Sequence, residues 1–225
     1  MASTDASRLD EAYDEDLLVP GHCACGALSF IIDLNVGRPS TSAYCHCTRC
    51  QRFNGAPFVH TLHLPFAAVS WMPEACEDVG APHLDSNTLQ EAQMDRENRG
   101  FPKARGGSWS ELLETYEAQA GRKWKLRCKV CSSPMGSWSV VRNGWSIWPP
   151  TIQRAPSTAE EASNHNNTNN TPTSHFTGKQ LASQKAWRLM RPDHHQFYGP
   201  WRSFDVQDDG RDKFIGYKGK SERVA

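Results

Sequence analysis

Cys45-His46-Cys47-Thr48-Arg49-Cys50 is the stretch that decides the fold expected for this chain. Three thiols stand within six residues, and a disulfide can use at most two of them. A soft divalent metal can use all three, and zinc is the usual metal for thiolate clusters. The stretch therefore predicts a metal site around which the neighbouring chain folds.

Two further cysteine pairs flank this triplet, Cys23-Ala24-Cys25 upstream and Cys128-Lys129-Val130-Cys131 downstream. Seven sulfurs divide naturally as four plus three. Four thiolates close a tetrahedral zinc site, which makes it structural, whereas three leave one position open, as a catalytic zinc requires. The two pairs would form the closed site and the triplet the open one. Spacing alone also allows a partition that mixes the triplet with one pair, or His46 as a fourth ligand that closes the second site.

Composition narrows the class of protein. The 225 residues carry no formal net charge, which does not suggest a general electrostatic grip on nucleic acid. The N-terminal residues lack the apolar region of a secretory signal, and no run approaches the ~20 apolar residues of a membrane span. We therefore expect a cytoplasmic protein with no nucleic-acid or membrane partner. In a reducing compartment, closely spaced cysteines are metal ligands rather than disulfides, and the lone Cys76 is expected to be an ordinary thiol.

The pattern of side chains predicts a mainly β protein with one short helix in an insertion. Alternation favours strands at 26–33, 58–64 and 66–71, and a hairpin at 137–148 about Asn143-Gly144. The triplet falls on a loop or short turn. A capping-box pattern that starts at Ser108, an apolar stripe and a stop at Gly121 predict a helix over about 109–120.

The predicted layout is a single domain over 18–225, preceded by a flexible tail at 1–17. Two segments read as insertions, one at about 73–123 and one at about 151–178. The second is rich in Asn, Thr and Ser, a composition that does not bury a core.

Three cysteine motifs, in this order, resemble those of the glutathione-dependent formaldehyde-activating enzyme family, which also includes centromere protein V. Gly21-His22-Cys23-Ala24-Cys25-Gly26-Ala27 is similar to its opening motif, Cys45–Cys50 with Gly55-Ala56-Pro57-Phe58 to its second, and Arg127-Cys128-x-x-Cys131 to its third. The closing segment is represented by His195, Trp201, Asp209-Gly210 and Phe214. One departure is Cys131-Ser132, where the family usually has Cys-Gly.

The resemblance implies an Mss4-like fold of antiparallel sheets pinned by zinc, with two zinc ions per chain. It implies the same division of ligands: Cys23, Cys25, Cys128 and Cys131 for structural zinc, and Cys45, Cys47 and Cys50 for catalytic zinc. Members of the family are described as carbon–sulfur lyases that act on adducts between glutathione and small carbonyl compounds.

The hypothesis for function is thus a zinc-dependent carbon–sulfur lyase with a small thiol or thioether substrate, glutathione being the expected co-substrate. The long insertions also suit a tailored biosynthetic enzyme with a larger substrate than formaldehyde. A zinc-binding interaction module without catalysis is the alternative. Candidates for proton transfer are His46, His60, His63 and His195; candidates for carboxylate binding are Arg49 and Arg52; and candidates for the pocket wall are Phe53, Trp138 and Trp145.

Overall fold

The computed structural model describes residues 14–73, 112–153, 182–202 and 209–224. They form two sheets, three short 3₁₀-helices and two longer helices, so the prediction of a mainly β protein is confirmed. Cys76, the capping box at Ser108 and most of both predicted insertions lie outside the described residues.

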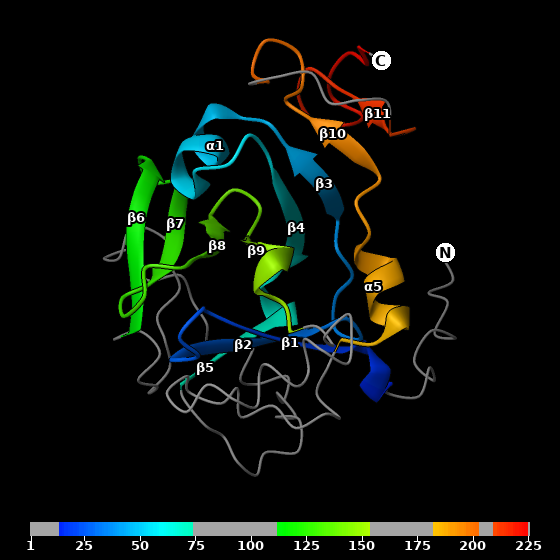
Figure 1. Ribbon diagram of the computed structural model, residues 1–225. Helices are drawn as coiled ribbons and strands as arrows, with labels where there is room; N and C mark the ends of the chain where they lie inside the picture. The colour runs from blue at the N-terminus through cyan, green and yellow to red at the C-terminus, as the bar shows by residue number, and fades with distance from the viewer. Residues whose placement is uncertain (1–13, 74–111, 154–181, 203–208, 225) are drawn as a thin grey trace, which may run out of the picture.

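The larger sheet has eight strands and is strongly curled (Figure 1). All neighbouring strands are antiparallel, except that β10 runs parallel to β3 and to β11. This makes the sheet mixed. In spatial order its strands are β11 (Asp212–Lys213), β10 (His194–Gln196), β3 (Thr41–Cys45), β4 (Val59–Pro65), β9 (Gly144–Ile147), β8 (Pro134–Ser139), β7 (Lys123–Cys128) and β6 (Leu113–Gln119).

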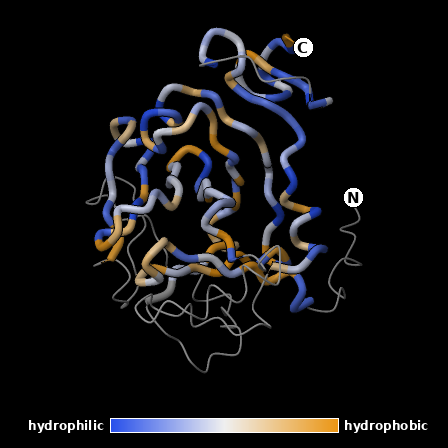
Figure 2. The backbone as a smooth tube through the Cα atoms, viewed as in Figure 1, coloured by the Kyte–Doolittle hydropathy of each residue, from blue (hydrophilic) through white to orange (hydrophobic). Residues whose placement is uncertain are grey.

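The smaller sheet has the order β1-β2-β5 and lies below the larger one in Figure 1. Its strands are β1 (Leu18–His22), β2 (Leu28–Asp33) and β5 (Val69–Pro73). Phe30 and Trp71 of this sheet pack edge to face, and Trp71 in turn contacts Trp145 of the larger sheet. The main core therefore fills the space between the sheets, and Figure 2 shows hydrophobic colour densest along the smaller one.

Two helices border the larger sheet. Helix α1 (Thr48–Asn54) follows β3 closely. Helix α5 (Gln184–Met190) is capped by Ser183, whose hydroxyl accepts a hydrogen bond from the Ala186 amide. The 3₁₀-helices are η1 (Glu15–Leu17), η2 (Phe66–Ala68) and η4 (Pro149–Thr151). None of the helices in the described ranges has the length and apolar character of a membrane-spanning segment.

The helix predicted over 109–120 is wrong for residues 113–119, which form β6. This strand pairs along its length with β7, and the tertiary pairing outweighs the weak helical stripe in the sequence. Gly121, interpreted as a helix stop, has a φ of 61° and turns the β6–β7 hairpin instead. The loop predicted for the triplet is also wrong in part, because Cys50 lies inside α1.

The predicted strands and hairpin are largely confirmed. The strands expected at 26–33 and 58–64 are β2 and β4, and the hairpin about Asn143-Gly144 joins β8 to β9. The strand expected at 66–71 begins only at Val69, after η2. Two limits of the predicted layout differ from the structure: Leu17 is buried in the core although it was assigned to the tail, and residues 113–123 belong to the main sheet rather than to an insertion.

Candidate metal centres

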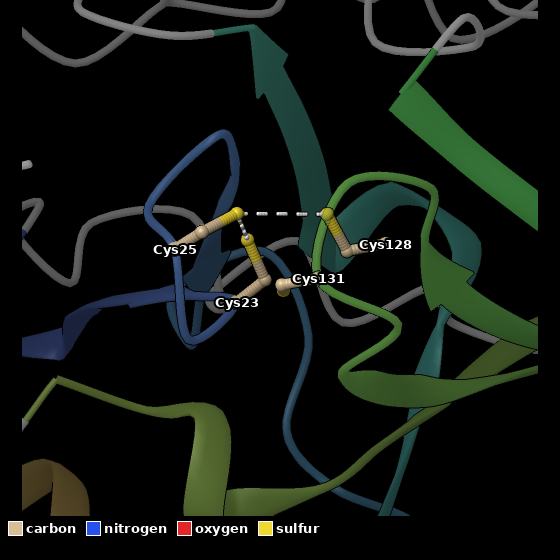
Figure 3. Close-up of side chains that lie close together, drawn as sticks. All are labelled: Cys23, Cys25, Cys128 and Cys131. Carbon is tan, nitrogen blue, oxygen red and sulfur yellow. Dashed lines mark hydrogen bonds between the residues drawn. The ribbon is translucent and has the colours of Figure 1, made fainter.

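Four cysteine sulfurs meet where the two sheets adjoin (Figure 3). Cys23 and Cys25 come from the loop between β1 and β2, Cys128 ends β7, and Cys131 lies in the turn that leads to β8. All four sulfurs lie within 4.8 Å of one another. The Cys23–Cys25 distance is 3.4 Å and the Cys25–Cys128 distance is 3.9 Å. Zn–S bonds of about 2.3 Å in a tetrahedron place sulfurs about 3.8 Å apart, so this donor set fits zinc.

Backbone hydrogen bonds shape both loops for this purpose. The Gly26 amide donates to the Cys23 carbonyl, and the Ser132 amide donates to the Cys128 carbonyl. Ser132 adopts a φ of 59°, the left-handed conformation that glycine usually occupies. Ser132 thus closes a tight turn between Cys128 and Cys131.

The thiols of this four-cysteine cluster differ in acidity. Burial raises the pKa of Cys23. Burial acts to raise the pKa of Cys131, but hydrogen bonds with Ser133 and Cys25 together outweigh it, and the pKa falls to about 6. Such a cysteine is a ready thiolate ligand at neutral pH.

The other three sulfurs, of Cys45, Cys47 and Cys50, form a second group within 4.8 Å of one another. Cys45 ends β3, Cys47 is the residue just before α1, and Cys50 lies in its first turn. The strand-to-helix corner is what directs three thiols to one point. Within the described ranges, no fourth His, Cys, Asp or Glu joins this group.

Lys125 lies directly beside this three-cysteine cluster. Its Nζ is 3.5 Å from Cys50 Sγ and 4.8 Å from the ring centre of Trp148. Hydrogen bonds from Cys45 and Cys47, and then the charge of Lys125, hold the pKa of Cys50 well below its usual range. Within this cluster, Cys50 is therefore the thiol that ionises most readily.

His46 does not belong to either group of sulfurs. Its Nε2 lies 2.9 Å from His195 Nδ1, and His195 Nε2 lies 3.0 Å from Asp209 Oδ2. Burial, followed by the charge of His195, lowers the pKa of His46 to about 4. The imidazole is thus committed to a buried chain of hydrogen bonds rather than turned towards the sulfurs.

The other residues that the sequence suggested for proton transfer, carboxylate binding and the pocket wall lie in different parts of the structure. His63 contacts Arg142, and His60 lies 2.9 Å from Ser42 Oγ. The Arg49 guanidinium meets the amide oxygen of Gln119 when that amide is oriented to accept, and Arg52 is exposed. Two aromatic side chains proposed for the pocket wall, Trp138 and Trp145, belong to the main core, whereas the third, Phe53, packs against Lys125 and Arg127.

Lys125 is the residue near the three-cysteine cluster that the sequence analysis missed. A signal was present in Lys123-Trp124-Lys125-Leu126-Arg127-Cys128, where cations and apolar residues alternate up to a metal-type cysteine. In a strand, such alternation sends all three cations to one face.

Comparison with known proteins agrees with the first two cysteine motifs. Residues 18–92 match the family model "Glutathione-dependent formaldehyde-activating enzyme". No curated protein matches the chain.

Among solved structures, a Rhodobacter sphaeroides protein is 10% identical, covering 61% of this chain and 91% of its own, at a TM-score of 0.36. A score this low supports no structural conclusion. The segment 18–92 therefore carries the signature of the glutathione-dependent formaldehyde-activating enzyme family, as the cysteine motifs predicted.

Proposed function

We propose that this protein is a zinc-dependent enzyme that makes or cleaves a carbon–sulfur bond in a thiol adduct at Cys45, Cys47 and Cys50. The observation that supports this most is the unequal grouping of the sulfurs, four in one cluster and three in the other. Four thiolates complete a tetrahedral site, whereas three leave a position for the sulfur of a substrate. We assign two zinc ions per chain on the same basis.

Zinc bound by three thiolates would supply a mild Lewis acid that lowers the pKa of a thiol. The surrounding residues prepare the site for a sulfur anion. Lys125 donates towards Cys50, and its charge offsets the excess negative charge of three thiolates. Trp148 and Val59 pack against Cys45 and Cys50 and keep bulk water away from them. Low solvent access strengthens each of these electrostatic interactions.

The reaction class is addition of a thiol to a carbonyl compound, or its reverse. A bond forms between the thiol sulfur and the carbonyl carbon, and the thiol proton passes to the carbonyl oxygen. The reverse reaction breaks the same bond and returns the proton. The family match supports glutathione as the thiol and formaldehyde as the carbonyl compound to be tested first.

Two cysteine variants test this proposal. Free thiol is measured during incubation of glutathione with formaldehyde, using wild type, Cys47→Ser and Cys131→Ser. We expect Cys47→Ser to lose about a hundredfold or more of the rate, because the site loses a ligand. Cys131→Ser, normalised to folded protein, should keep most of the rate, because its sulfur belongs to the other cluster.

Equal rates for wild type and Cys47→Ser would overturn the catalytic role of the three-cysteine cluster. The zinc-binding interaction module would then be the better description. Zinc content, measured on each variant by elemental analysis, should fall from about two equivalents to about one in both.

We further propose a small-molecule thiol or thioether as the partner, no nucleic acid, and a cytoplasmic location. The location is supported by the cysteines of the described residues, all seven of which are free rather than paired in disulfides. Localisation of a tagged full-length chain by cell fractionation tests this assignment.

A further inference from the structure

A row of polar side chains crosses four strands of the larger sheet. His63 on β4 is opposite Ser146 on β9, Ser146 is opposite Ser137 on β8, and Ser137 is opposite Lys125 on β7. On a solvated sheet face such residues would be exposed. Here they are 6, 2, 0 and 3% exposed in that order. The polar row therefore lies inside the protein.

The row occupies the face of the sheet that looks away from the main core. On each of these strands, a residue next to the row member belongs to the main core: Leu62, Ile147, Trp138 and Leu126. Alternation in a strand puts the polar row on the second face. In Figure 1, α1 lies above β7 and β8, and β10 and β11 form the upper edge of the sheet beyond β3.

Unpartnered polar atoms occur within the polar row, on its extension along β4, and beside the three-cysteine cluster. Ser137 Oγ, Thr61 Oγ1 and Trp148 Nε1 are buried and have no hydrogen-bond partner among the described residues. Thr61 is two residues from His63 and two from Val59, which is opposite Cys45, so it extends the row towards the sulfurs. Buried polar groups are nearly always satisfied, so these atoms indicate that a ligand or water lies here.

Three cations gather in this region, beside the three-cysteine cluster. Lys125 belongs to the row. Lys123 lies two residues before it on β7, on the same face of the strand, and Arg142 contacts His63. Burial, and then the like charge of Lys125, lowers the pKa of Lys123, and Arg142 acts in the same direction. In the part of the chain that the structure describes, no carboxylate forms an ion pair with any of the three cations.

We propose that the polar row binds a carboxylate of the thiol substrate whose sulfur occupies the three-cysteine cluster. The inference rests on the proposed function and deepens it by naming residues that give the site a preference for thiols that carry a carboxylate. A carboxylate accepts hydrogen bonds from the Ser137 and Thr61 hydroxyls and offsets the charge of Lys123. The site discriminates against alcohols, which lack the charge, and against amines, which the cations repel.

Three small thiols that differ in one group test this proposal. Binding of 3-mercaptopropionate, 3-mercaptopropanol and cysteamine to the zinc-loaded full chain is measured by calorimetry. We expect wild type to bind the carboxylate about tenfold or more tighter than the alcohol, and cysteamine weakest. Ser137→Ala and Lys123→Met should each bind the carboxylate only about as well as the alcohol, with the alcohol unchanged.

Two further variants make the result specific. Lys123→Arg keeps the charge and should keep most of the preference, and Lys220→Met, which removes an exposed lysine, should match wild type. Circular dichroism and zinc content check that each variant is folded and loaded. If Lys123→Met does not fold, Ser137→Ala carries the test with the same expectation.

The outcomes separate this inference from the proposed function. Wild type that binds the carboxylate and the alcohol equally well overturns the carboxylate site but leaves the open zinc site in place. Wild type that binds none of the thiols overturns the open zinc site, and the carboxylate site falls with it. A preference for the carboxylate that survives in Ser137→Ala and Lys123→Met overturns the assignment to the polar row.

Discussion

Ser132 closes the Cys128–Cys131 turn in a conformation that costs most side chains free energy. Its φ of 59° brings its amide onto the Cys128 carbonyl, which draws Cys131 towards the other sulfurs. An L-residue in this region is disfavoured by about 1–2 kcal/mol, whereas glycine is not. A single backbone angle thus sets the position of a ligand.

The substitution Ser132→Gly relieves this strain but also raises the conformational entropy of the unfolded chain. The net effect should be a stabilisation of about 0.5–1 kcal/mol. Urea denaturation of the zinc-loaded protein measures the change. Asn143→Gly is the matched control, because Asn143 has a φ of 46° but asparagine tolerates this region. A loss of stability in Ser132→Gly, with no loss in the control, would contradict this account of the turn.

His60 makes stability depend on pH. Burial, followed by the charge of Arg211, lowers its pKa to about 4, and its ring packs on Tyr44. The unfolded chain, with a histidine pKa near 6.5, binds the proton more readily. The contribution of neutral His60 is therefore complete above about pH 6.5 and is lost as the pH falls towards 4, by up to about 3 kcal/mol.

The variant His60→Gln cannot titrate and still reaches Ser42, so its free energy of unfolding should fall less steeply over this range than that of wild type. Chemical denaturation at several pH values gives both curves. The comparison is made between proteins at the same pH, because acid also protonates the cysteines. Parallel curves would rule out His60 as a source of the acid sensitivity.

At the scale of elements, the centre of the larger sheet depends on a close approach of β9 to β4. Gly144 begins β9 and is opposite Pro65 of β4 and Ser139 of β8. A Cβ added at Gly144 would lie 2.4 Å from the carbonyl oxygen of Leu64, which is backbone and has little room to move. The contact fixes the register in which Ser146 meets His63.

We expect Gly144→Ala to destabilise the protein by about 1–3 kcal/mol, the usual cost of overpacking. Thermal denaturation measures this loss. Gly121→Asn serves as control: nothing lies within 4 Å of a Cβ there, and asparagine accepts the φ of 61°. Equal small effects in both variants would show that β4 can move aside.

At the scale of the whole molecule, the four-cysteine cluster joins the two sheets. Cys25, ahead of β2, and Cys128, at the end of β7, are 103 residues apart in the chain. The three-cysteine cluster does not connect distant parts of the chain. Its members lie at the end of β3, just before α1, and in the first turn of α1. The two clusters should therefore contribute very differently to stability.

Loss of zinc from the four-cysteine cluster should cost several kcal/mol, because metal binding there is coupled to folding. Cys128→Ser is expected to lower the melting temperature far more than Cys47→Ser, although each loses about one zinc. A chelator should reproduce the larger effect in wild type. Equal losses in the two variants would contradict the division into a structural and an open site.

The sequence by itself indicated how the cysteines group and where most of the strands lie. A disulfide cannot use all three thiols within six residues, which favours a metal site. Alternation in 58–64 and the Asn143-Gly144 turn are signals carried by local sequence. The four-plus-three division of cysteines was favoured on the number of bonds that zinc forms. The structure groups the sulfurs in the same way, with metal binding itself still a prediction.

Only the tertiary structure decided which residues surround the three-cysteine cluster. The sequence of β6 carries a helical pattern. The segment is nevertheless a strand, because it pairs with β7. Lys125 and Ser137 lie in one row with His63 only through the register in which β7, β8 and β9 pair with one another and with β4. Pairing register is a long-range property, set by packing on the core face, and local sequence does not contain it.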